Sequence, residues 1–146
     1  MEQIQLLINI QKDQTALIYT LWSFFQGLSL VLIGFVFTHE YVRKSRPILA
    51  CLSTSLFIFS IGNHQAIVRA QNLVAAATKQ LNEAAAANPG LQGVLQAFEA
   101  PSTSGLEAAH FLFTAFVVIG VWVPYLVSRL SERFGPANPA PGTAKR

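Results

Sequence analysis

Charged residues are scarce in this chain of 146 residues: Asp, Glu, Lys and Arg make up 12% of it, whereas about 25% is usual in soluble domains. Three segments have no formally charged residue at all, namely 14–39, 47–68 and 108–128. Each exceeds the roughly 20 residues that a helix needs to cross the hydrocarbon core of a bilayer. The composition therefore excludes an ordinary soluble protein and predicts three membrane-spanning helices.

Other absences reduce the number of possible functions. Cys51 is the only cysteine, so no intrachain disulfide can form. The chain contains no G-x-S-x-G, no H-E-x-x-H and no glycine-rich phosphate loop. The three segments also lack the Asp, Glu, Lys or Arg that marks a transport pathway inside a membrane. We therefore expect neither an enzyme nor a transporter, and no catalytic residue or bound metal.

These features predict an all-α integral membrane protein with one membrane domain over residues 1–134 and a flexible tail over 135–146. The three spans are expected at about 15–39, 47–68 and 108–128, with an external helical loop at 69–107.

Span two is expected to continue outward as one long helix, because residues 70–87 are strong helix formers and no Gly or Pro interrupts them before Asn88-Pro89-Gly90. Residues 91–100 are expected to form the second arm of an external helical hairpin. The first 14 residues form either a short interfacial helix or an extension of span one. Pro124 is expected to kink span three.

The basic residues cluster at the ends of the spans, and those of the first loop and the third span's exit are Arg43, Lys44, Arg46, Arg129 and Arg133. Because Lys and Arg are enriched in cytoplasmic flanks, we expect the N-terminus outside and the C-terminus in the cytoplasm, in a bacterial inner membrane. The pI is about 9.4. Because the basic residues lie at the ends of the spans, we interpret them as topology signals and lipid-headgroup contacts rather than as a nucleic-acid interface, so the lipid bilayer is the first expected partner.

Small and polar residues recur along one stripe of each span; the residues expected to mediate helix packing are Thr20, Gly27, Gly34, Ser53, Ser60 and Thr114. Helices associate in lipid through such residues, because lipid is as apolar as leucine. The simplest arrangement is a three-helix bundle with the stripes inward. In the alternative, the Gly27 and Gly34 seam meets another subunit. Gln26 lies in mid-span off this stripe, and its amide needs a partner.

His64 and His110 are the only pair that could carry chemistry, because both are expected near the outer interface on the polar stripes. They could bind haem as a cofactor, hold a metal with further ligands, or titrate as a pair near neutral pH. The commoner role for such histidines is a hydrogen bond to a neighbouring helix or to interfacial water.

The sequence thus predicts a non-catalytic membrane protein that acts through helix–helix contacts, as an accessory subunit or as a protein that binds another membrane protein or itself. Two alternatives stay open. One is a homo-oligomeric pore, since the plan of three spans with the N-terminus outside is similar to that of phage holins with three spans. The other is a small redox subunit that carries haem between His64 and His110.

Overall fold

The computed structural model describes residues 2–88, 90 and 103–134, which are 97% helical. The helices are α1 (Glu2–Thr38), α2 (Glu40–Lys44), α3 (Arg46–Ala87) and α5 (Thr103–Phe134). Three of them, α1, α3 and α5, are long and apolar enough to cross a membrane. The predicted all-α fold with three candidate spans is therefore confirmed.

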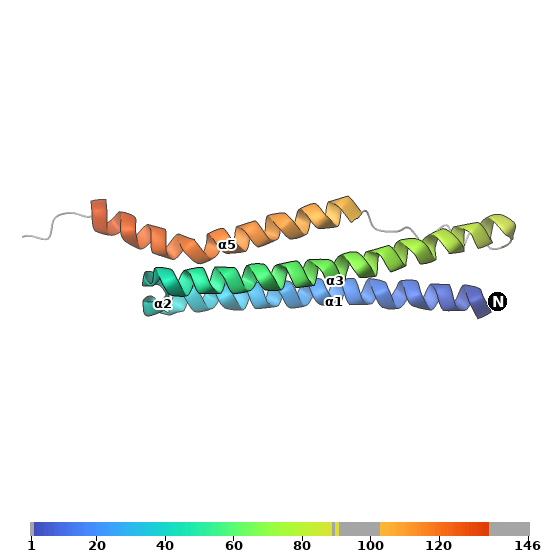
Figure 1. The fold of residues 1–146 in the computed structure, drawn as a ribbon, viewed down its shortest axis with the longest axis horizontal. Coiled ribbons are helices and arrows are strands. Elements are labelled where there is room, and N and C mark those ends of the chain that lie inside the picture. Colours follow the sequence, from blue (N-terminus) through green and yellow to red (C-terminus); the bar gives the residue numbers. More distant parts are fainter. Residues whose placement is uncertain (1, 89, 91–102, 135–146) are drawn as a thin grey trace, which may run out of the picture.

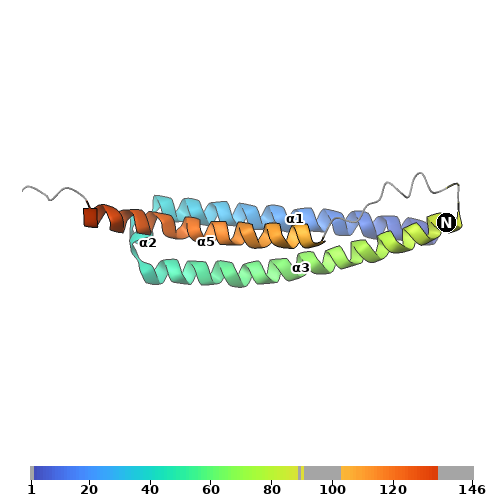
Figure 2. The ribbon, with the colours of Figure 1, turned by 90° about the horizontal axis from the view of Figure 1, so that it is seen from above.

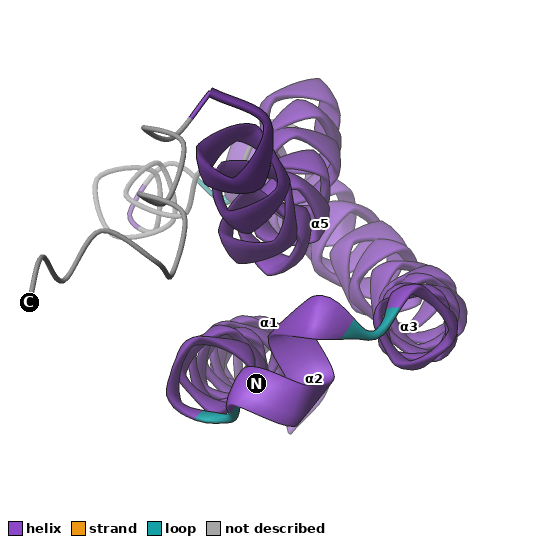
Figure 3. Cartoon of the chain, turned by 90° about the vertical axis from the view of Figure 1, so that its left-hand side faces the viewer, coloured by secondary structure: helices purple, strands orange, loops and turns teal. Residues whose placement is uncertain are grey.

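Helices α1 and α3 run antiparallel along their full lengths, joined by the short α2 (Figure 1). Helix α5 lies along the half of this pair that is nearer to α2, and the end view shows the three long helices at the corners of a triangle (Figure 3). The view from above places α5 over α1, with α3 beside them (Figure 2). The result is a three-helix bundle from which a two-helix part projects.

The α1–α3 pair is built on a regular spacing of buried side chains. In α1 the buried residues are Leu7, Gln11, Ile18, Phe25, Ser29 and Val36, at steps of four and seven. In α3 they run from Leu49 to Ala85, mostly at steps of three and four. This is the spacing that keeps one face of each helix against the other in antiparallel and parallel coiled coils alike.

The projecting hairpin, defined here as residues 2–14 of α1 and 71–87 of α3, has its own small core. Leu7 packs there against Ala77, Leu81 and Ala85. Helix α3 thus continues beyond the predicted end of span two as far as Ala87, and residues 2–14 extend α1 rather than forming a separate helix. The helix that packs against this part of α3 is α1, whereas the sequence predicted a second arm at 91–100 as its neighbour. The expected second arm at 91–100 lies outside the described residues.

Helix α5 contains Pro124 and bends in its middle, so that its two ends diverge from α3 (Figure 1). A proline inside a helix removes one backbone hydrogen bond and causes this kind of bend. Gly120 lies at the close approach of α5 to α1, where an added Cβ would be 3.4 Å from Ile33 Cδ1. The bend therefore brings the middle of α5 onto the other two helices.

Candidate functional site

A layer of hydrogen-bonded polar side chains joins α3 to α5 within the spans. Ser60 Oγ and Thr114 Oγ1 are 2.8 Å apart, and both residues are buried. Asn63 Nδ2 lies 3.3 Å from His110 Nε2. Trp122 Nε1 donates to Ser53 Oγ at 3.0 Å. Three residues expected to mediate helix packing, Ser53, Ser60 and Thr114, therefore lie at this contact.

The two histidines of the spans are neighbours at the end of this layer that is nearer to the projecting hairpin. Their ring centroids are 5.2 Å apart and the ring planes are inclined by 48°. His110 is buried, and its ring stacks on Phe25 at 4.7 Å with an angle of 13°. Trp22 contacts the same ring edge-on at 5.3 Å. His110 is thus enclosed by α1 and α3, whereas His64 is only half-buried.

This geometry suits a structural histidine better than a haem ligand. Axial imidazoles bind one iron from opposite faces of a flat ring, so that their nitrogens must point at each other across it. Here Nε2 of His110 is occupied by the Asn63 amide, and Phe25 covers a face of the ring. Within the described ranges no group of three or more His, Cys, Asp or Glu could hold a metal ion.

A groove of about 720 Å³ runs beside His64 between α3 and α5. Its walls are largely apolar, including Phe57, Ile61, Phe111 and Ile119. In addition to His64 and His110, the lining includes the carboxylate of Glu107. Hydrocarbon can fill the apolar remainder of the groove in a membrane without any polar requirement.

Asn63 is a member of this layer that the sequence analysis did not single out. It lies three residues after Ser60 and four before Ile67, on the buried face of α3. The spacing of three and four residues would have found it, because the same spacing selects Ser60 and Ile67. An amide at a buried position of a span needs a hydrogen-bond partner, and His110 supplies it.

The small-residue stripe of α1 faces away from the bundle, which corrects the expected inward orientation. Thr20, Gly27 and Gly34 are exposed, and a Cβ added at either glycine would meet no atom within 4 Å. The reason is the continuity of α1. One helix has one inward face, and the buried series from Leu7 to Val36 occupies it along the whole length.

The exposed face of α1, called here the outer seam, is defined by Thr20, Ser23, Gly27, Gly34 and Thr38. Thr20 and Thr38 donate to the carbonyls of Ala16 and Gly34, each at 2.9 Å. These bonds satisfy the hydroxyls within the helix. Gln26, on the flank of the seam, is exposed and has no hydrogen-bond partner among the described side chains.

The basic residues expected to set topology lie together at the α2 end of the bundle. Arg43 and Lys44 belong to α2, Arg46 begins α3, and Arg129 and Arg133 lie in the last turns of α5. Both exits from the spans thus carry their cations on the same side. Comparison of the chain with protein-family models, with curated proteins and with solved structures gave no match.

Proposed function

We propose that this protein is a non-catalytic membrane subunit that binds another membrane helix through the outer seam of α1. The observation that carries the proposal is that Gly27 and Gly34 are exposed, and that a Cβ added at either position would have no neighbour within 4 Å. Glycine gives a helix no packing surface of its own, and its value in a span is that another backbone can come close.

The contrast with Gly120 supports this argument. Gly120 lies where α5 approaches Ile33 of α1, so its small size serves the bundle itself. Gly27 and Gly34 serve no such contact within the described chain. They are seven residues apart, a spacing that returns to the same side of a helix at 3.5 residues per turn and suits a left-handed crossing.

Gln26 supplies a second reason for a partner beside the seam. Its amide faces outward in mid-span, where hydrocarbon offers no hydrogen bond, and an unpaired buried amide costs roughly 1–3 kcal/mol by protein mutational data. A polar group on an approaching helix would remove that cost. Because the partner contacts α1 alone, a second copy of this chain and a different membrane protein are both compatible with the seam.

The proposed orientation has the α2 end in the cytoplasm and the projecting hairpin outside, in a bacterial inner membrane. Its support is the arrangement of the five basic residues at the α2 end, since positive flanks are retained on the cytoplasmic side. Reporters fused at Lys44 and at Asn88 should therefore be found in different compartments. Finding both in one compartment would refute this topology.

The test of the seam is the double variant Gly27→Leu/Gly34→Leu, purified in mild detergent. Gly62→Leu is the matched control: Gly62 is also exposed with no atom within 4 Å. Gln11 of α1 and Thr78 of α3 lie at one level of the bundle, because they are hydrogen-bonded to each other. Gly27 and Gly62 are equally far along their helices from these two residues, so the two glycines also lie at one level. We expect the wild-type and Gly62→Leu proteins to retain a stoichiometric partner or to self-associate, and the double variant to lose it.

A wild-type protein that is monomeric by light scattering and carries no partner would contradict the proposal. Equal loss in the double variant and in Gly62→Leu would also contradict it, because the contact would then not lie at the seam. If the wild type self-associates and releases dye from liposomes, the pore alternative is favoured over the accessory role.

A further inference from the structure

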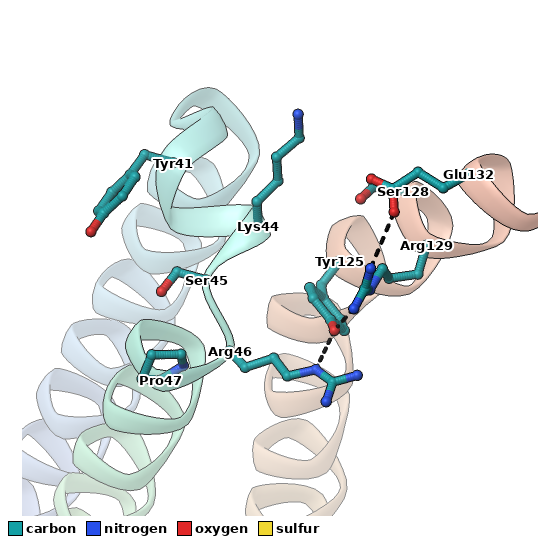
Figure 4. A pocket seen from close by; sticks show the side chains of 9 residues that line it. All are labelled: Tyr41, Lys44, Ser45, Arg46, Pro47, Tyr125, Ser128, Arg129 and Glu132. Carbon is teal, nitrogen blue, oxygen red and sulfur yellow. Dashed lines mark hydrogen bonds and ion pairs between the residues drawn. The ribbon is translucent and has the colours of Figure 1, made fainter. Parts of the chain in front are cut away.

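A cavity of about 550 Å³ opens at the α2 end of the bundle, between the start of α3 and the last turns of α5. Its lining includes Lys44, Arg46, Tyr125 and Arg129. Figure 4 shows Arg46 reaching from α3 toward Tyr125 and Arg129 on α5, with Lys44 rising from α2 at the other edge. The volume is within the range of small-molecule sites, about 300–1,000 Å³.

The charges of this cavity are not balanced. Lys44 pairs with Glu40 at 2.6 Å, and Arg129 pairs with Glu132 at 3.3 Å. Arg46 takes part in neither ion pair, and in the described ranges no carboxylate lies within ion-pair distance of it. The cavity therefore keeps one uncompensated guanidinium in its wall.

Two guanidinium groups converge on a single phenol. Nε of Arg46 and Nε of Arg129 both donate to the Tyr125 hydroxyl, the second at 3.2 Å. Their Cζ atoms lie 5.3 and 5.8 Å from the centroid of the Tyr125 ring. Like charges this close repel each other, and the Nη groups of Arg46 donate to no acceptor among the described residues. An anion with several oxygens would bind both guanidinium groups, as phosphate does in bidentate arginine sites.

A second, apolar cavity of about 380 Å³ adjoins the first, and the two share Lys44 and Ser128. Phe37, Val123, Pro124 and Val127 line it, together with the charged residues Glu40, Arg43 and Lys44. The bend at Pro124 leads the last turns of α5 away from α3 (Figure 1). A polar, cationic cavity next to an apolar one, at the end of three spans, matches a molecule with an anionic head and a hydrocarbon chain.

We propose that this end of the bundle is a binding site for an anionic phospholipid, whose phosphate is held by Arg46 and Arg129 and whose acyl chain lies along Phe37, Val123 and Val127. Basic pockets between spans on the cytoplasmic side bind phosphate headgroups in this way. The site shares no residue with the outer seam of α1, so it does not depend on the proposed role of that seam; its place on the cytoplasmic side rests on the proposed topology. A free phosphate ion would use the same guanidinium groups but not the apolar cavity.

The experiment titrates phosphatidylglycerol or phosphatidylcholine into the full-length protein in mild detergent and counts bound lipid by native mass spectrometry. We expect tighter binding of phosphatidylglycerol to the wild type. Arg46→Gln should weaken it about tenfold or more, because the phosphate loses a charge-assisted hydrogen bond, and should leave the binding of phosphatidylcholine unchanged. The control is Arg133→Gln, which removes the same charge at the same end but outside both cavities, and should weaken binding about fivefold or less, the effect of one basic side chain at a membrane surface.

Three results would overturn the site. The first is equal affinity for the two lipids in the wild type. The second is equal weakening by Arg46→Gln and Arg133→Gln, which would indicate unspecific surface charge. The third is displacement of phosphatidylglycerol by millimolar inorganic phosphate with no effect of Val127→Phe, which would indicate a phosphate site without a lipid chain. Arg129→Gln provides a second variant if Arg46→Gln does not retain wild-type helicity.

Discussion

The projecting hairpin and the three-helix part of the bundle have similar interiors and opposite surfaces. Around the hairpin the exposed side chains include Lys12, Asp13, Lys79 and Glu83. Around the three-helix part they are large and apolar, and include Phe24, Leu30, Ile58, Phe111 and Phe116. Between α1 and α3, however, buried residues follow the same spacing through both regions.

In the proposed topology, one packing rule operates in two solvents, water around the hairpin and lipid around the three-helix part, while the driving force changes. In water, burial of apolar area stabilises the hairpin by about 25 cal/mol per Å². In lipid that term is absent, and helices associate through close packing and hydrogen bonds. The three-helix part carries the Ser60–Thr114 and Asn63–His110 contacts. The hairpin combines an apolar core of Leu7, Ala77 and Leu81 with the Gln11–Thr78 hydrogen bond.

The largest expected effect is a difference between two identical substitutions on α3. Leu81 in the hairpin and Leu56 in the span are 0% and 3% exposed. Leu81→Ala should cost about 3 kcal/mol, because a soluble core loses both the transfer term and the cavity term. Leu56→Ala should cost about half as much, because only the packing term is lost in lipid. Hydrogen exchange of the hairpin and of the three-helix part measures the two losses of stability, and Leu73→Ala, at an exposed position, is the control. Equal losses for Leu81→Ala and Leu56→Ala would contradict the proposed difference in driving force.

Gln11 gives the next largest effect, in the opposite direction. It is buried between α1 and α3 and donates to Thr78 Oγ1 at 3.2 Å, while its Oε1 has no partner. The double variant Gln11→Leu/Thr78→Val should stabilise the hairpin by about 1 kcal/mol, since it replaces both buried hydrogen-bond partners, including the unsatisfied amide oxygen, by apolar side chains at core positions. Greater protection of the hairpin amides in hydrogen exchange would record the gain. A loss of protection would mean that the Gln11–Thr78 bond outweighs the cost of burying the amide.

A smaller effect is expected for the hydrogen bond between Ser60 and Thr114. A double-mutant cycle with Ser60→Ala and Thr114→Val should give a coupling energy of about 0.6 kcal/mol, the average for interhelical hydrogen bonds in membranes. Unfolding from mixed micelles can measure it. A coupling energy above about 2 kcal/mol would exceed the range known for such bonds, and the polar layer would then dominate the stability of the three-helix part.

The smallest effect concerns the α2 end, where Lys44 and Glu40 form an exposed ion pair. The hydrogen bond from Lys44 and its charge hold the pKa of Glu40 below the usual value for a glutamate. Because the pKa of Glu40 is lowered in the folded state, the ion pair stabilises the fold at neutral pH. This stabilisation disappears as the pH falls through the pKa that Glu40 has in the folded protein. Lys44→Ala should raise the pKa of Glu40 toward its usual value, as an NMR titration would show, without a measurable change in stability; no change in this pKa would disprove the pairing.

Much of the fold follows from local sequence features. The uncharged segments predict three apolar helices, which the structure contains. The run of helix-forming residues after Arg69 predicts that the second of them continues to Ala87, as α3 does. Which face of α1 lies inward did not follow, because in lipid both a small-residue stripe and a Phe/Val stripe are acceptable surfaces. His64 and His110 could be placed at one depth, but the contacts of His110 with Asn63 and Phe25 depend on how three helices are rotated against each other.

By itself, the sequence determined that the chain has three helices apolar enough to cross a bilayer, because hydrocarbon excludes charge segment by segment. Only the tertiary structure decided that the outer seam of α1 is exposed, that α1 is the partner of the α3 extension, and that Arg46 and Arg129 meet at Tyr125. Those features depend on the rotation and offset of whole helices. Contacts between residues far apart in the chain set both, and no local pattern records them.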